Sequence, residues 1–78
     1  MPTLLNVDGF RFFFYSNEHL PIHIHVEKAQ KTAKFNLEFV ELIKSSGFNA
    51  VEIKQIRKLV ELNQEFLIQK WDEYFNNK

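Results

Sequence analysis

Apolar and polar residues alternate along the chain with two different periods. Over residues 3–43 apolar side chains mostly recur at every second position, and over residues 50–75 they recur at every third or fourth. The first period is typical of a β-strand with one buried face, and the second of an amphipathic helix. No linker-like segment or internal repeat separates the two regions. The pattern therefore predicts a single α+β domain over residues 1–78, with an antiparallel sheet of about four strands followed by two helices packed on one of its faces.

The strongest turn signal lies at Asp8-Gly9, between two segments of alternating apolar residues. An Asp-Gly pair in this context favours a two-residue hairpin turn of type I′. The residue pairs expected across this hairpin are Val7–Phe10, Leu5–Phe12 and Leu4–Phe13. The four strands are expected over 3–7, 10–15, 22–28 and 32–39. Residues 40–43 either continue the fourth strand past a bulge or form a short fifth strand, and the pattern does not decide between the two.

Asn49 marks the expected start of the first helix, over about residues 50–62. Its side chain can accept a hydrogen bond from the first turn, and Glu52 stands where a capping box requires an acidic residue. Asn63 follows the first apolar stripe. Like Asn49, it is preceded by an apolar residue, Leu62, and followed by an acidic one, Glu65, in what would be the first helical turn. It predicts a break, with a second helix over about 64–76. A single helix over 50–76 is the alternative.

The pleat of the strands divides their side chains between two faces. The face expected to lie against the helices holds Phe10, Phe12, Phe14, Ile22, Ile24, Val26, Phe35, Leu37 and Phe39. The other face, called the open face below, holds Arg11, Phe13, Tyr15, His23, His25, Glu27, Lys34, Asn36 and Glu38, with Leu4 at its edge. Because the helices cover only one side of the sheet, the open face is the candidate place for function.

The composition limits what so small a domain can do. A chain of 78 residues buries only about 60–65% of the surface that its unfolded form exposes, so its core is marginal. The absence of cysteine excludes disulfides, thiolate metal ligands and thiol nucleophiles. Ten basic residues balance ten acidic ones. This balance disfavours nucleic-acid binding, which draws much of its affinity from neutralising phosphates.

Neither a membrane span nor a signal peptide is expected. No apolar run approaches the roughly 20 residues that cross a bilayer, and the N-terminus lacks a basic region followed by an apolar block. A soluble cytoplasmic protein with no membrane partner is therefore expected. No cofactor is expected either.

The segment "HIHVE" carries His23, His25 and Glu27 at every second position of the third strand. These side chains then stand on the open face, about 6.5–7 Å apart at each step. One interpretation is a solvated strand face, which needs polar residues. A second is a protein interface, because Phe13 and Tyr15 on the same face have the aromatic character of interface cores. The expected binding face comprises Phe13, Tyr15, His23, His25, Glu27 and Lys34.

Two chemical interpretations of the same segment remain. Two imidazoles and a carboxylate are the ligand set of catalytic zinc and of some iron sites, so His19, His23, His25 and Glu27 are weak candidates for metal ligands. Metal-free acid–base chemistry on RNA is the other interpretation. His23 or His25 would then act as the base, and Arg11 or Lys34 would stabilise phosphate charge.

Five segments carry a likeness to a known family. They are "MPTLL", "GFRFFFYSNE", "PIHIHVEK", "AKFNLEFVEL" and "GFNAVEIKQIRKLVELNQE". In this order they resemble the small bacterial family filed as domain of unknown function 4160, over nearly the whole chain. The most specific part is a proline followed by two histidines with one residue between them, matched here by Pro21, His23 and His25. A second proline often precedes the first in the family, where this chain has Leu20.

The resemblance implies a genetic context but no activity. Members of the family are often encoded beside another small protein, in pairs that look like toxin–antitoxin modules. No catalytic residues are established for the family, so none are carried over. We therefore expect a small protein-binding module in the manner of a toxin–antitoxin pair, which contacts a protein encoded nearby or a second copy in a homodimer. The alternative is a small His-dependent ribonuclease or metal-dependent hydrolase that uses the same face.

Overall fold

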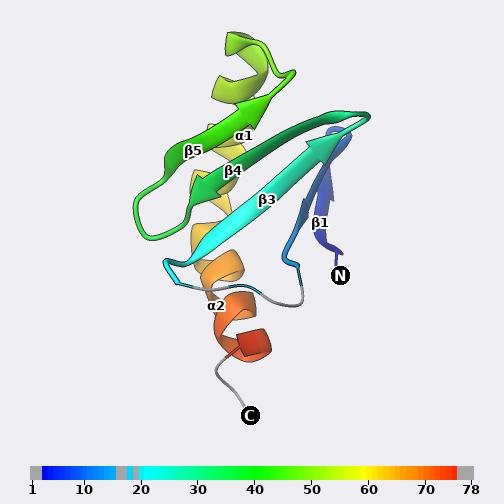
Figure 1. The fold of residues 1–78 in the computed structure, drawn as a ribbon. Helices are drawn as coiled ribbons and strands as arrows, with labels where there is room; N and C mark the ends of the chain where they lie inside the picture. Colours follow the sequence, from blue (N-terminus) through cyan, green and yellow to red (C-terminus); the bar gives the residue numbers. More distant parts are fainter. Residues whose placement is uncertain (1–2, 16–17, 19, 76–78) are drawn as a thin grey trace.

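The computed structural model describes residues 3–15, 18 and 20–75 (Figure 1). Its strands form one antiparallel sheet in the order β1-β2-β3-β4-β5, so each strand pairs with the next along the chain. The strands are β1 (Thr3–Val7), β2 (Phe10–Phe13), β3 (His23–Lys28), β4 (Lys31–Asn36) and β5 (Glu41–Ser46). The helices α1 (Ala50–Leu62) and α2 (Gln64–Phe75) follow one another along the same side of the sheet (Figure 1). The predicted α+β class is confirmed.

The hairpin between β1 and β2 has the predicted turn. Asp8 and Gly9 both have positive φ angles, 53° and 83°, as a type I′ turn requires. The pairs Val7–Phe10 and Leu5–Phe12 also form as predicted. The third pair differs, because the register shifts and Thr3 takes the place of Leu4 opposite Phe13. Leu4 packs against the core instead of lying at the edge of the open face.

β4 ends earlier than predicted and a fifth strand follows it. The Asn36 side chain accepts hydrogen bonds from the backbone N–H groups of Glu38 and Phe39, at 3.0 and 3.3 Å. Such a contact replaces strand pairing with a turn. Phe39 therefore lies in the turn with 75% of its surface exposed, and its assignment to the core was wrong. The chain then returns as β5, which answers the question left open for residues 40–43.

The two helices are separated at Asn63, as predicted. The capping box at the start of α1 is present, since Asn49 Oδ1 accepts from the Glu52 N–H and Glu52 Oε1 accepts from the Asn49 N–H. Asn63 acts differently from Asn49. Its side-chain amide donates to the Leu59 carbonyl at 2.7 Å, so it caps the end of α1 instead of the start of α2.

The core lies between the helices and one face of the sheet. That face contributes Phe10, Phe12, Phe14, Ile24, Val26, Ala33, Phe35 and Leu37, and the helices contribute Ile56, Val60, Leu67 and Trp71. All of these residues are buried, and Trp71 packs edge-on against Phe14. Apart from Phe39 and Leu4, the predicted face assignment is therefore correct. His23 and His25 lie on the opposite side of β3 from Ile24 and Val26, although Trp71 of α2 still contacts the His23 ring.

Candidate functional site

The segment after β2 returns across part of the open face. Tyr15 packs edge-on against both Phe13 and His25, with ring centroids 5.2 and 4.6 Å apart. The Arg11 guanidinium lies over the Phe13 ring at 4.3 Å. Between these neighbours Phe13 is only 2% exposed, although the helices do not cover it. Phe13 was predicted to be a contact residue of the binding face. In the structure its side chain is buried, and its part in binding stays a prediction.

The same segment brings Glu18 to the histidines of β3. One carboxylate oxygen, Oε1, lies 2.8 Å from His23 Nε2, and the other, Oε2, lies 2.8 Å from His25 Nε2. The three side chains, called the Glu18–His23–His25 cluster below, are 9%, 5% and 18% exposed. One nitrogen or oxygen from each lies within 4.8 Å of the other two. The cluster is therefore a nearly buried group of two imidazoles and one carboxylate.

His23 is held by both of its ring nitrogens. Nδ1 lies 2.8 Å from the carbonyl oxygen of Pro21, which can only accept a hydrogen bond, so Nδ1 carries a proton. In the neutral ring Nε2 then presents a lone pair, and it faces a Glu18 oxygen. A lone pair facing a carboxylate at 2.8 Å is unfavourable. Either a second proton on His23 or a cation between the two groups removes the repulsion.

His25 is close to Glu18 but is not hydrogen-bonded to it. Its Nε2 atom is buried and lies 2.8 Å from Glu18 Oε2, but no hydrogen bond from it is found among the described residues. Burial is the largest influence on the pKa of His25, and together with the interactions with His23 and Lys34 it outweighs the opposing attraction of Glu18, so the pKa is lowered below its usual value. His25 is therefore a neutral imidazole at neutral pH, with a buried nitrogen directed into the cluster.

Glu18 is the anion of the cluster. Burial is the largest influence on its pKa and acts to raise it. The hydrogen bond from the Tyr15 N–H, at 3.0 Å, and the interactions with His23 and His25 together exceed that influence. The pKa of Glu18 is consequently below its usual value, and the group is a carboxylate at neutral pH.

The other residues predicted for the site lie nearby but outside the cluster. Arg11 forms an ion pair with Glu27 across β2 and β3, and its Nε atom donates to Thr3 Oγ1 at 2.8 Å. Glu27 is thus engaged by Arg11 instead of joining the histidines. Lys34 lies directly opposite His25 on β4. His19, a predicted weak metal ligand, lies outside the residues that the structure describes.

Two pockets flank the cluster on the open face. The first, of about 300 Å³, is lined by Glu18, Leu20, Pro21, His23, Lys34 and Ile43. The second, of about 330 Å³, includes Tyr15, His25, Lys34 and Lys44. Glu18 and His23 therefore line one pocket and His25 lines the other, with Lys34 between them. A small molecule in either pocket would contact the cluster.

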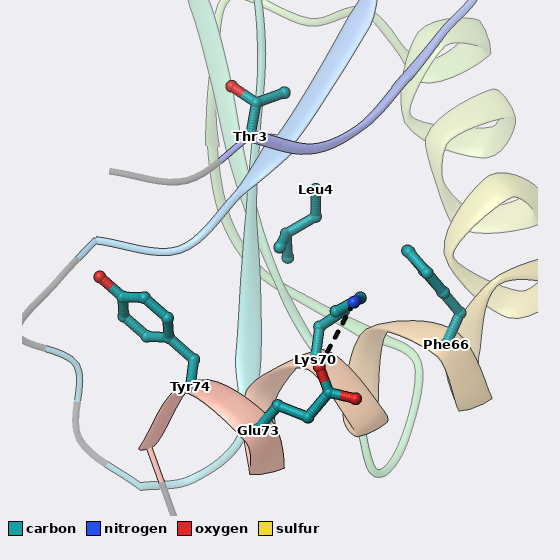
Figure 2. A pocket seen from close by; sticks show the side chains of 6 residues that line it. All are labelled: Thr3, Leu4, Phe66, Lys70, Glu73 and Tyr74. Carbon is teal, nitrogen blue, oxygen red and sulfur yellow. Dashed lines mark hydrogen bonds and ion pairs between the residues drawn. The ribbon is translucent and has the colours of Figure 1, made fainter. Parts of the chain in front are cut away.

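A larger pocket lies at another place, between β1 and α2 (Figure 2). It measures about 600 Å³ and is lined by Thr3, Leu4, Phe66, Lys70, Glu73 and Tyr74. Its two charged residues, Lys70 and Glu73, pair with each other at 3.3 Å (Figure 2). It holds none of the predicted site residues and no histidine, so size alone is a poor guide to the chemistry here.

Comparison with known proteins gives one result. The model of the family described as Domain of unknown function (DUF4160) matches residues 9–72. The chain belongs to this family. The DUF4160 match contains the whole cluster and both flanking pockets. No curated protein and no solved structure matches the chain.

Sequence reasoning missed Glu18. It identified the two histidines but assigned Glu27 as their carboxylate, because Glu27 continues their alternation on the same strand. Glu18 precedes His23 by five residues in a segment that looked like an ordinary loop. The available signal was an acidic residue in the loop that enters a histidine-bearing strand.

Over the described residues, no helix is long and apolar enough to cross a lipid bilayer.

Proposed function

We propose that this DUF4160 protein binds a divalent transition-metal ion of the Zn²⁺ type through Glu18, His23 and His25. The supporting observation is the convergence of three donor atoms in a nearly buried site, where His23 Nε2 presents a lone pair because Nδ1 is committed to the Pro21 carbonyl. A backbone carbonyl that accepts from the second ring nitrogen is a common feature of metal-bound histidine, since it orients the ring.

The donor set favours a particular class of metal. Two imidazole nitrogens with one carboxylate oxygen suit Zn²⁺ and similar ions better than Mg²⁺ or Ca²⁺, which prefer oxygen ligands alone. Zinc bound tetrahedrally at about 2.0–2.1 Å would separate its donors by about 3.4 Å. The nitrogen–oxygen contacts of the cluster are 2.8 Å. Binding would therefore move each histidine nitrogen about half an ångström away from its Glu18 oxygen, which is within the reach of small rotations.

Three protein ligands leave one position of a tetrahedral ion for water. Zinc sites of this kind activate the bound water for hydrolysis, whereas structural sites use four protein ligands. The flanking pockets would give a substrate access to that position. Metal-dependent hydrolysis is accordingly the activity that we propose for the site.

The test is a calorimetric titration of Zn²⁺ into metal-free protein, with two carboxylate variants compared. Glu18→Gln removes a proposed ligand oxygen and keeps the shape of the side chain, so we expect it to weaken binding by at least about tenfold. Glu27→Gln is the matched control, because Glu27 is a carboxylate on the same face that pairs with Arg11. It should bind Zn²⁺ like the unaltered protein.

Histidine NMR provides a second measurement that does not depend on the variants. Zn²⁺ should shift the ring signals of His23 and His25 together, at one equivalent of metal. Binding that leaves these two rings unmoved, or that Glu27→Gln weakens as much as Glu18→Gln does, would show that the cluster is not the metal site.

Association with a protein partner stays a prediction. The burial of Phe13 removes the largest apolar side chain from the expected contact surface. Exposed apolar side chains remain around the two pockets, namely Tyr15, Leu20 and Ile43. They are compatible with a small contact surface.

A further inference from the structure

Two lysines oppose each other directly on the open face. Lys34 of β4 and Lys44 of β5 are Cα partners across the antiparallel pair. Like charges in this arrangement destabilise a sheet, because their side chains extend side by side. Within the described part of the chain, neither lysine has a hydrogen bond or an ion pair with another residue. The sheet thus carries a concentrated positive charge that the described protein does not neutralise.

The other basic residues on the strands that the structure describes do have partners. Arg11 pairs with Glu27, and Lys31 pairs with Glu52 of α1 at 2.7 Å. Lys28 lies near the Asp8 carbonyl and over the Phe10 ring. The absence of a partner is therefore a local property of the Lys34–Lys44 pair and not a general property of this surface.

The lysine pair lines the pocket of about 330 Å³ together with many hydrogen-bond donors. Thr32, Ser45 and Ser46 bring hydroxyl groups, and Tyr15 brings a phenol. None of the residues that line this pocket is acidic. Two ammonium groups and several hydroxyls suit a tetrahedral oxyanion, which has several acceptor oxygens and a charge that offsets the lysine repulsion.

We infer that this pocket binds the phosphate group of a small phosphate ester, held by Lys34 and Lys44. The volume is at the lower end of the range for ligand sites, about 300–1,000 Å³, which fits a mononucleotide better than a polymer. A chain of zero net charge without a long basic stripe also fits a small ligand better than extended RNA. Tyr15, which is 47% exposed at the pocket, offers a ring on which a base could stack.

The phosphate site adjoins the proposed metal site but does not depend on it. Lys34 and Lys44 are not proposed metal ligands, and neither Glu18 nor a bound ion is needed to hold the phosphate group. His25 and Lys34 connect the two sites, because His25 lines the phosphate pocket and Lys34 lines both pockets. If a metal is bound by the cluster, the adjacent substrate would accordingly be a phosphate ester.

The experiment is a calorimetric titration of the full, metal-free chain at low salt with three probes. These are inorganic phosphate, adenosine 5′-monophosphate and a short single-stranded RNA. At least one of the first two should bind. Lys34→Gln and Lys44→Gln should each weaken that binding by about tenfold or more, since each removes a charged hydrogen bond. Lys58→Gln is the control, because Lys58 is an exposed lysine on α1, and it should bind as the unaltered protein does.

A second measurement separates loss of ligand from loss of structure. Removing one of two opposed charges should leave the melting temperature of the ligand-free protein unchanged or raise it. Weaker phosphate binding by a variant that is at least as stable supports a site for an anion. A variant that loses binding only because it unfolds earlier contradicts it.

Each remaining outcome either supports the phosphate site or overturns it. Binding that persists in Glu18→Gln and without metal supports the phosphate site even if the metal proposal fails. Tighter binding of the nucleotide than of phosphate supports the role of Tyr15 as well. The inference is overturned if neither phosphate nor the nucleotide binds, if RNA alone binds, or if both lysine variants bind like the Lys58→Gln control.

Discussion

At the scale of single residues, His23 differs from an ordinary strand histidine because both of its ring nitrogens face an oxygen. Pro21 supplies one oxygen and Glu18 the other, each at 2.8 Å. Trp71 packs against the same ring, at 5.2 Å between centroids. A histidine on a solvated strand face would not need this environment. The burial of the ring argues against the simplest interpretation of "HIHVE", that its polar residues only face water.

The cluster predicts how the stability of the metal-free protein depends on pH. The pKa of His25 is lowered from 6.5, chiefly by burial, so the unfolded chain binds a proton more readily than the folded one. The stability from this group is present above about pH 6.5 and is lost as the pH falls through the folded-state value. The pKa of Glu18 is lowered from 4.5, so it adds a second loss of the same sign below about pH 4.5.

We therefore expect the melting temperature to fall as the pH drops below about 6.5 and to fall again below about pH 4.5. Circular dichroism in the presence of a chelator measures both steps. His25→Gln has no titrating ring at this position, so its first step should be smaller. An equally large first step in this variant would mean that His25 is not responsible for it.

The residue types of the site could be predicted, but not their grouping. Two histidines on one face of a strand follow from alternation alone. The choice of Glu18 over Glu27 depends on the path of a loop and on which acid Arg11 occupies, and both are tertiary contacts. The burial of Phe13 has the same origin, since Tyr15 and Arg11 cover it.

At the scale of elements, the parts that were predicted correctly are those that local chemistry determines. The Asp8-Gly9 turn and the Asn49–Glu52 capping box each lie within four residues and need no distant partner. The end of β4 was mispredicted because Phe39 continues the apolar alternation beyond the point where the Asn36 side chain turns the backbone. Periodicity describes which face a strand would use, and not where the strand stops.

The capping box gives a prediction for the stability of α1. Asn49→Ala removes the side chain that accepts from the Glu52 N–H, and the loss of such a cap costs about 1 kcal/mol. For a domain of this size that corresponds to a fall in melting temperature of roughly 4–8 °C. Thermal denaturation measures it. Gln55→Ala, at an exposed position within the same helix, is the control and should change little. Equal effects of the two substitutions would contradict a role for the cap.

At the scale of the whole molecule, association with another chain is the property that the sequence predicted and that a solution experiment must decide. Leu20 is 77% exposed at the rim of the pocket that contains His23, so its side chain contributes little to the fold. Leu20→Asp should abolish self-association, or co-purification with the protein encoded nearby, if the open face is the contact surface.

Leu62→Asp is the matched control for that experiment, because Leu62 is 81% exposed at the end of α1 and lies outside both open-face pockets. Light scattering gives the mass in solution for both variants. A complex that survives Leu20→Asp, or that Leu62→Asp disrupts equally, would place the contact elsewhere on the molecule.

The contact between Trp71 and His23 has an optical consequence. Trp71 is the only tryptophan of the chain, and it bridges the core and the candidate site by packing against Phe14 on one side and His23 on the other. The fluorescence of an indole ring responds to charge in its immediate neighbourhood. A proton or a metal ion at His23 should therefore change the emission of the native protein, so that occupancy of the site can be followed without any label.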